Sequence, residues 1–386
     1  MSEPDIPKGN KHFFANRHVI ATVIVITLLF TGVLVASGIV SFIRPMAIYP
    51  SITPIATDGG TEESEFIFPF EEIRYRLRMP VDVTVYSGAR TGSKSAILYG
   101  DIPDEEWMPG YYRAFIDDPH QESLYSGLLS AFSGIRDEQA LDSDRYLEMI
   151  TAFVQSIPYE THPEGAPPKF PVETITERTG DCDDKSLLLA ALLTRAGYDV
   201  ALLDFLADAH MAVGVRSKEN SYGSTGYAYI ETTAFNFVGD VPENLADGVH
   251  LTGEPLVIRI GEGNTTYGAG SQTASIIERE MEARAVIEEV GPGVAEHSAR
   301  LQAAEERLRK EREEIESLLS SGQTVRYNTL VPGYNSQVAA YNQDLGTYGT
   351  EAAYYDRAVR IYNYIVGHRY DRQGTYEWLR SNPLQP

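Results

Sequence analysis

The only cysteine of this 386-residue chain stands directly before its most apolar segment. Residues 180–186 read GDCDDKS, and the next seven residues are LLLAALL. An apolar run of this length without glycine or proline predicts a buried helix from Cys182 to Ala196, with Gly197 as the residue that ends it. The rest of the chain is therefore expected to pack around this helix.

The position of Cys182 makes it a candidate nucleophile. The positive end of a helix dipole can lower the pKa of a thiol at the helix N-terminus. The flanking carboxylates Asp181, Asp183 and Asp184 act in the opposite direction, because nearby negative charge disfavours the thiolate. A nucleophilic thiol at this position therefore requires a nearby base.

Three strand-like runs follow the helix, and two of them carry groups that could serve the thiol. Residues 198–203 form the first run, residues 208–215 carry His210 directly before MAVGV, and residues 226–233 carry Glu231 near their end. A catalytic thiol needs a base, and the base needs a third group that fixes its tautomer and orientation. Cys182, His210 and Glu231 are therefore the predicted catalytic residues.

The order of these residues resembles the transglutaminase-like superfamily of papain-type Cys-His-Asp enzymes. The matching segments are TGDC ending at Cys182, the leucine-rich helix, AHMAV around His210 and YIETT around Glu231, and the resemblance covers about residues 140–245. It implies an α+β fold with a papain-like core, in which the cysteine helix packs on an antiparallel sheet. It also implies Cys182 as nucleophile, His210 as general base and acid, and Glu231 as the orienting carboxylate. The third residue of the family is usually Asp, and this chain has Glu.

Other interpretations of the same residues are possible. A lone cysteine beside an apolar helix is most often a small buried hydrophobic residue, and a lone histidine before a strand is usually structural. The joint occurrence of three groups in this order favours the triad. A metal site is disfavoured because the ligands lack the paired spacing of such sites, and no cofactor is predicted. His162, in the proline-rich loop 159–171, is a weaker rival to His210 as the base.

The N-terminal region predicts a membrane anchor. Residues 19–43 carry no charge and are long enough to span a bilayer as one helix. Three basic residues precede this stretch, whereas acidic residues dominate after Arg44, so residues 1–18 are expected in the cytoplasm and the main domain outside the cell. No good cleavage site follows residue 43, which disfavours a signal peptide. Residues 44–65, with several Pro, Gly, Ser and Thr, are expected to form a linker.

Charge and cysteine content exclude some functions. The formal net charge of −23 excludes nucleic acid as a partner, because a phosphate backbone would be repelled. A single cysteine excludes a disulfide within the chain, so the fold depends on its apolar core.

The predicted catalytic domain occupies residues 66–260, with its core at 140–245. Residues 81–86 alternate between apolar and polar side chains and predict a strand that is followed by a turn. Apolar positions at helical spacing predict a helix from about residue 142 to 157, and residues 256–260 predict the last strand. The glycine-rich segment 261–270 is expected to be a hinge.

Residues 271–370 predict a helical coiled coil, followed by a tail over 371–386. Val294, Leu301, Leu308 and Ile315 recur every seven residues. A second series has tyrosine at every seventh position from 327 to 362, with apolar residues offset by four. The break at residues 320–322 predicts an antiparallel hairpin, which is expected to serve as a spacer or to bind a partner protein or a second copy of the chain.

These observations favour a membrane-anchored extracytoplasmic cysteine enzyme that acts on peptide or protein amides through a thioester. Hydrolysis is the preferred outcome, as in a peptidase or amidase, and transfer to an amine is the other. The alternative is a non-catalytic binding or assembly module that acts through its coiled coil. If the hairpin is a separate domain, deletion of residues 271–386 is expected to leave the reactivity of Cys182 intact.

Overall fold

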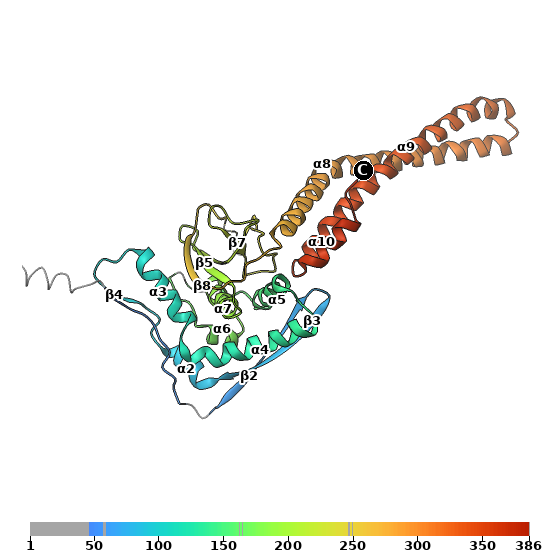
Figure 1. Cartoon of the computed structure of the whole chain (residues 1–386). Helices are drawn as coiled ribbons and strands as arrows, with labels where there is room; N and C mark the ends of the chain where they lie inside the picture. Colours follow the sequence, from blue (N-terminus) through green and yellow to red (C-terminus); the bar gives the residue numbers. More distant parts are fainter. Residues whose placement is uncertain are drawn as a thin grey trace, which may run out of the picture. The chain divides into compact units, whose positions relative to one another are not determined.

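The computed structural model describes residues 46–56, 59–161, 163, 165–245, 248 and 250–385. It confirms a mixed α+β protein with a long pair of helices at its C-terminal end (Figure 1). The predicted cytoplasmic segment 1–18 and the predicted transmembrane helix 19–43 lie outside the described residues, as does His162. Among the helices that are described, none is both long and apolar enough to cross a membrane.

Two short strands form a small unit of their own. β1 (Met46–Ile48) pairs antiparallel with β4 (Ile97–Tyr99). Among the described residues, this unit comprises residues 46–48 together with residues 96–107, which include the start of α3 (Asp104–Ile116). All other described residues belong to the second unit.

A two-stranded ribbon opens the second unit. β2 (Thr61–Phe70) and β3 (Ile73–Asp82) pair antiparallel along their whole length. β2 buries alternate residues such as Phe66, Phe68 and Phe70, as expected for a strand with one face on the core. Because β2 begins at Thr61, the last residues of the predicted linker are part of this ribbon.

The predicted strand over residues 81–86 is wrong. β3 ends at Asp82, and α2 (Val83–Thr91) begins directly after it. The Asp82 side chain accepts a 2.8 Å hydrogen bond from the Thr84 backbone N–H and thereby caps the new helix. Val83 and Val85 favour a strand, but the cap at Asp82 favours a helix, and the helix forms.

The centre of the unit is α7 (Cys182–Arg195), the helix that the sequence predicts most strongly. All seven residues from Leu187 to Leu193 are fully buried. On one side the helix packs against α4 (Glu122–Glu138), α5 (Ser143–Gln155) and α6 (Pro171–Glu177). Its other side packs on a four-stranded sheet (Figure 1). The predicted helix over 142–157 is confirmed by α5, with Asp142 as its N-terminal cap.

The sheet is antiparallel throughout, with the strand order β7-β6-β5-β8. β5 spans Asp199–Phe205 and β6 spans His210–Arg216. β7 spans Tyr227–Ile230 and β8 spans Leu256–Glu262. These strands confirm the four predicted after Cys182. Side chains on β5 and β6 are buried almost without exception, and α7 packs against both strands.

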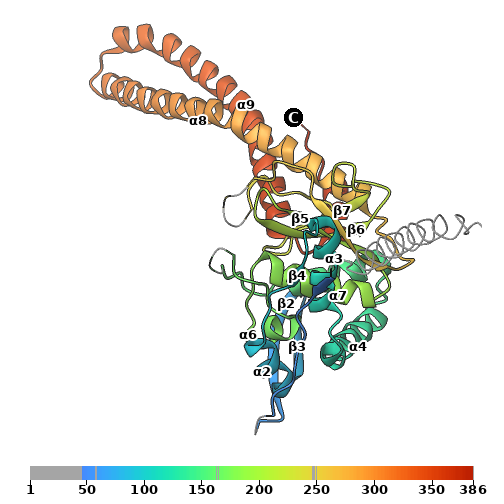
Figure 2. The ribbon, with the colours of Figure 1, turned by 90° about the vertical axis from the view of Figure 1, so that its left-hand side faces the viewer.

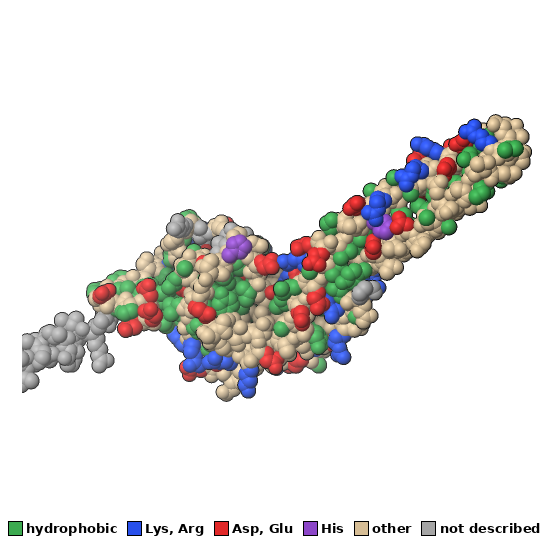
Figure 3. Space-filling model, turned by 90° about the horizontal axis from the view of Figure 1, so that it is seen from above, with side chains coloured by type: hydrophobic (Ala, Val, Ile, Leu, Met, Phe, Trp, Pro, Cys, Tyr) green, Lys and Arg blue, Asp and Glu red, His purple; other side chains and the backbone are tan. Residues whose placement is uncertain are grey.

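The C-terminal helix pair consists of α8 (Gly270–Ser320) and α9 (Thr324–Gly367), which lie side by side and antiparallel (Figure 2). The turn between them contains Gly322 at φ +73°, a conformation that glycine adopts easily. Three members of the seven-residue series of α8, Val294, Leu301 and Ile315, are buried between the two helices and form the seam of the pair. The tyrosines of the second series are half-buried, so their hydroxyls can reach water. Figure 3 shows the charged side chains of the pair gathered along one of its sides.

The lower part of the helix pair, toward residues 270 and 367, is built into the core. A buried apolar cluster there joins both helices, α10 (Arg372–Ser381) and one residue of the loop after β7. Its members are Phe237, Ile276, Ala283, Ala358, Ile361, Ile365 and Leu379. We name this region the hairpin base and the remainder, residues 294–354, the hairpin arm.

Polar contacts tie the same region to the rest of the fold. Arg372 of α10 donates to both carboxylate oxygens of Glu148 on α5, and the Tyr267 hydroxyl donates to Glu148 over 2.7 Å. The predicted hinge therefore contains a buried tyrosine, and the predicted tail contains a helix that packs on the core. The expectation that Cys182 keeps its reactivity when residues 271–386 are deleted therefore has no support in these contacts.

Candidate active site

A capping box places Cys182 at the first position of α7. The Asp181 carboxylate accepts from the Asp184 backbone N–H over 3.1 Å, and Asp184 accepts from the Asp181 N–H over 3.3 Å. The chain approaches closely here, since a Cβ on Gly180 would lie 2.8 Å from Cβ of Asp184. Glycine at position 180 therefore permits the turn that presents the thiol.

The Cys182 thiol lies against the beginning of β6. The backbone N–H of Met211, the residue after His210, lowers the pKa of the thiol. One helical turn later, Ser186 donates to the Met211 carbonyl over 3.1 Å, which holds α7 and β6 in this register. The structure thus brings Cys182 to the strand end that carries His210.

The thiol is held in a neutral form. Its pKa is raised by burial first and then by the negative charge of Asp183 and Asp181. Asp183 Oδ1 lies 3.5 Å from the sulfur, and only 9 % of Cys182 is exposed. The Met211 N–H favours the thiolate but does not offset these effects.

A tight turn between β5 and β6 positions His210. Phe205 and His210 are paired at the end of the two strands, and Asp208 N–H donates to the Phe205 carbonyl over 2.9 Å. Ala209, just before the histidine, has φ +48°, an uncommon conformation for a residue with a side chain. Strained backbone of this kind is concentrated near functional sites. The His210 side chain is 7 % exposed.

His210 and Glu231 are in contact, and a tyrosine bridges them. His210 Nε2 lies 3.4 Å from Glu231 Oε2 and 3.1 Å from the Tyr229 hydroxyl. The Tyr229 hydroxyl donates its proton to Glu231 Oε2 over 2.6 Å. Since that hydroxyl has only one proton, it must accept from His210 Nε2–H. This assigns the proton to Nε2 and leaves Nδ1 as the ring nitrogen that can accept a proton.

Glu231 is buried but remains ionised. It follows β7 directly, and its Oε1 accepts from the backbone N–H of Thr232, from that of Thr233 and from the Thr233 hydroxyl. Burial alone would raise the pKa of Glu231, but the bonds and charge of His210, with Thr233 and Tyr229, lower it to about 2. A carboxylate with this pKa stabilises a protonated imidazole.

Lys185 lies fully buried beneath the site. Its Nζ donates to the carbonyls of Ile157 over 2.6 Å and Gln155 over 3.3 Å, at the C-terminal end of α5. Burial lowers its pKa to about 8, and Glu231 opposes this shift. The Gln155 side chain in turn donates to the Glu231 carbonyl over 2.7 Å. Lys185 is thus part of the framework that supports the segment after β7.

The surroundings of the thiol are acidic. Burial, together with Asp181 and Asp204, raises the pKa of Asp183 to about 7. The Tyr112 hydroxyl donates to Asp204 over 3.1 Å. Asp183 therefore changes its charge near neutral pH beside the candidate nucleophile. Within the described ranges, no three His, Cys, Asp or Glu side chains are grouped to hold a metal ion.

Sequence reasoning missed Tyr229 and Lys185. Tyr229 precedes Glu231 by two residues, so the two side chains share one face of an extended segment, and this spacing was an available signal. Lys185 stands between acidic residues and a leucine run, which gives no indication of its carbonyl partners.

Comparison with protein-family models, with curated proteins and with solved structures finds no match for this chain.

Proposed function

We propose that this protein is a membrane-anchored extracytoplasmic cysteine enzyme with a transglutaminase-like, papain-type core, and that it transfers the acyl group of a peptide or protein amide through a thioester. The observation that carries this proposal is the contact of His210 with Tyr229 and Glu231, beside a helix that begins at Cys182. The α7 helix on an antiparallel sheet is the arrangement that the resemblance implies. The predicted apolar stretch 19–43 supports the membrane anchor.

In the proposed reaction, His210 acts as general base. Sγ of Cys182 attacks the amide carbonyl while its proton moves to Nδ1 of His210. The tetrahedral intermediate then expels the amine, which takes that proton, and leaves a thioester on Cys182. Water attacks the thioester with the help of His210, releases the carboxylic acid and restores the thiol. Ionised Glu231 stabilises the imidazolium in each step.

The neutral thiol distinguishes this site from a preformed thiolate–imidazolium pair. Because the pKa of Cys182 is raised, the proton leaves only when the base takes it during attack. Backbone N–H groups at a helix N-terminus point away from the helix, so the N–H of Cys182 is a candidate donor to the oxyanion. Water is the proposed acceptor in the absence of an evident amine site, and a peptide or protein is the proposed substrate.

A second candidate function is a non-catalytic binding or assembly module. The burial of Cys182 and its raised pKa favour this alternative, because a structural thiol has both properties. In that case the helix pair would bind a partner protein or a second copy of the chain.

An acyl-transfer assay with p-nitrophenyl acetate separates the two functions. We expect release of p-nitrophenolate, an acetyl group on Cys182 detected by mass spectrometry, and its subsequent loss. Cys182→Ala should abolish these events, and His210→Ala should slow acylation and deacylation about 100-fold. His250→Ala, which alters an exposed histidine outside the site, is the matched control. If His210→Ala acylates and deacylates like the wild type, the proposed function is wrong. Added methylamine tests whether an amine competes with water.

A further inference from the structure

The loop after β7 is irregular and yet almost wholly buried. Residues 231–240 contain no helix or strand, and eight of these ten residues are buried. Buried backbone groups need partners, and in such a loop side chains must supply many of them. Gln155 Nε2 donates to the carbonyls of both Glu231 and Asn236, over 2.7 Å and 3.0 Å, and thus joins the two ends of one turn. Asn236 donates to the Asp240 carbonyl over 2.8 Å.

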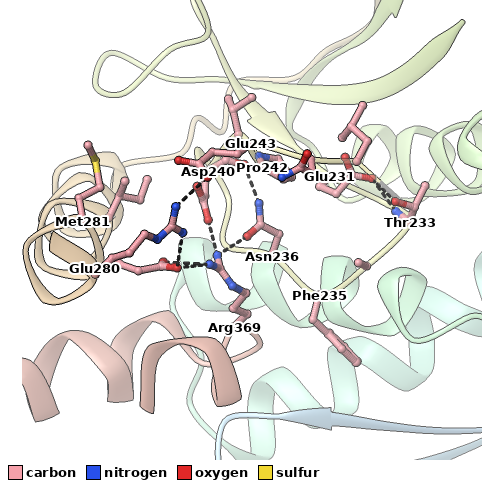
Figure 4. Close-up of a pocket in the computed structure, with 16 residues that line it drawn as sticks. Glu231, Thr233, Phe235, Asn236, Asp240, Pro242, Glu243, Glu280, Met281 and Arg369 are labelled. Carbon is pink, nitrogen blue, oxygen red and sulfur yellow. Dashed lines mark hydrogen bonds and ion pairs between the residues drawn. The ribbon is translucent and has the colours of Figure 1, made fainter. Parts of the chain in front are cut away.

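Arg369 holds the far side of this loop. It follows α9, and its Nη1 donates to Asn236 Oδ1 over 2.6 Å and to the Asp240 carboxylate. Its Nη2 donates to both carboxylate oxygens of Glu280 on α8, each over 2.8 Å (Figure 4). One guanidinium therefore binds the loop and the hairpin base together. Only an arginine has the planar set of donors that serves these acceptors at once.

An apolar contact connects the same two parts. Phe237, 2 % exposed, belongs to the buried cluster of the hairpin base, and the Arg369 guanidinium lies 5.9 Å from the centre of its ring. Two residues further, Gly239 N–H donates to the Tyr229 carbonyl over 2.7 Å. The segment 236–240 therefore folds back onto β7, the strand that carries Tyr229 and ends directly before Glu231.

We propose that Arg369 is a positioning residue, which holds Glu231 against His210 by fixing residues 236–240 to the hairpin base. The helix pair is then part of the active-site framework and not an appended spacer. This inference rests on the proposed function, but the contact between Glu231 and His210 can be measured independently of catalysis.

A cavity of about 390 Å³ lies beside this clamp, lined by residues of the loop after β7 and of α8. One of its lining residues offers a matched control. Arg284 lines the same cavity, donates to Glu243 over 2.7 Å and lies 3.7 Å from Glu280. Arg284 contacts Glu243, Glu280 and the Tyr362 ring, so Arg284→Met removes a comparable charge while the bonds of Arg369 to Asn236 and Asp240 stay in place.

The test compares Arg369→Met, Arg369→Lys, Arg284→Met and Glu231→Gln in the full chain. The first readout is the NMR signal of the His210 Nε2–H proton, identified by its loss in His210→Ala. Its chemical shift depends on the Tyr229 hydroxyl that accepts this proton and on the Glu231 carboxylate 3.4 Å away. The second is the deacylation rate of acetyl-Cys182. We expect Arg369→Met to move the signal in the direction of Glu231→Gln and to slow deacylation about tenfold. Arg369→Lys should produce a smaller signal shift and a smaller loss of deacylation rate, and Arg284→Met should resemble the wild type in both.

The double variant Glu231→Gln/Arg369→Met decides whether Arg369 acts through Glu231. A positioning role predicts that the double variant deacylates no more slowly than Glu231→Gln alone, because coupled residues give non-additive effects. The inference would be overturned if the two substitutions together slowed deacylation by the product of their separate effects. An unchanged His210 signal in the folded Arg369 variants would overturn it as well. If Arg369→Met does not fold, Arg369→Lys gives the answer. A shifted signal in a protein without Cys182-dependent turnover would retain the inference and reject the proposed function.

Discussion

The Tyr229 hydroxyl donates a 2.6 Å hydrogen bond to Glu231 Oε2 and lies 3.1 Å from Nε2 of His210. In a triad with Asp, the carboxylate alone orients the histidine. Here a carboxylate and a phenol both contact the histidine, and both come from one short extended segment. The bridge sets the tautomer of His210, because the phenol proton is already given to Glu231.

Replacement of Tyr229 by Phe should therefore impair the site without unfolding the protein. The change removes a hydrogen bond to a charged group, of the kind that contributes about 1.5–3 kcal/mol, and leaves the 3.4 Å contact between His210 and Glu231. We expect deacylation of acetyl-Cys182 to slow about tenfold or more. Tyr227→Phe is the control, since the Tyr227 hydroxyl binds Asp199 on the same sheet outside the site. Equal rates for the two variants would exclude a role for the bridge.

Asp183→Asn should make Cys182 more reactive. Asp183 raises the pKa of the thiol by its charge and by its contact with the sulfur, so its neutralisation should lower that pKa. Asp183 itself has a pKa raised to about 7, and below this pH it is mostly protonated and no longer opposes the thiolate. The gain should therefore appear above pH 7, with alkylation by iodoacetamide about tenfold faster at pH 8. The chain has one cysteine, so alkylation reports on this site alone.

Asp137→Asn, an exposed change at the end of α4, serves as the control for that experiment. If Asp183→Asn and Asp137→Asn alkylate equally at every pH, the acidic surroundings do not govern the thiol.

Lys185→Met should change how stability depends on pH. The pKa of Lys185 is lowered from 10.5 to about 8, so between these values the unfolded chain binds more protons at this residue than the folded chain does. Stability of the wild type should therefore rise across this window relative to Lys185→Met, by at most about 3 kcal/mol. Denaturant unfolding of both proteins at pH 7 and pH 10 measures the difference. A difference in unfolding free energy that stays constant with pH would contradict the lowered pKa.

The strength of local signals explains which elements could be predicted. The continuous apolar run after Cys182 and the β-rich runs after it leave few alternatives, and α7 with its sheet agrees with them. Residues 81–86 offered strand propensity, but one cap at Asp82 outweighed it. Such a cap contributes only about 1 kcal/mol, which is enough where the competing preference is equally small.

The hairpin base was harder to predict, because its buried residues do not occupy the positions of the seven-residue series. Ile361 and Ile365 each lie one residue before Tyr362 and Val366, which the seven-residue pattern assigns to the seam. A straight α-helix turns relative to a seven-residue repeat, so a different face is presented to the core at the base than along the arm. The charge partners of the base, such as Glu148 and Arg372, are 224 positions apart and share no sequence pattern.

Two truncations test whether the base, and not the arm, belongs to the catalytic unit. Removal of residues 271–386 would expose Phe237 and leave Glu148 buried without Arg372, a loss of one ion-pair partner that typically costs about 3–5 kcal/mol. We expect this chain to be unstable. Replacement of residues 296–351 by a short glycine-containing turn keeps the base cluster, because all of its members lie outside the removed range. That variant should retain both the acylation rate of Cys182 and a melting transition close to that of the wild type, measured by p-nitrophenolate release and circular dichroism. If the longer truncation melts and acylates like the wild type, the base is not part of the unit. If the arm deletion alone abolishes acylation in a folded protein, the arm itself contributes to the site.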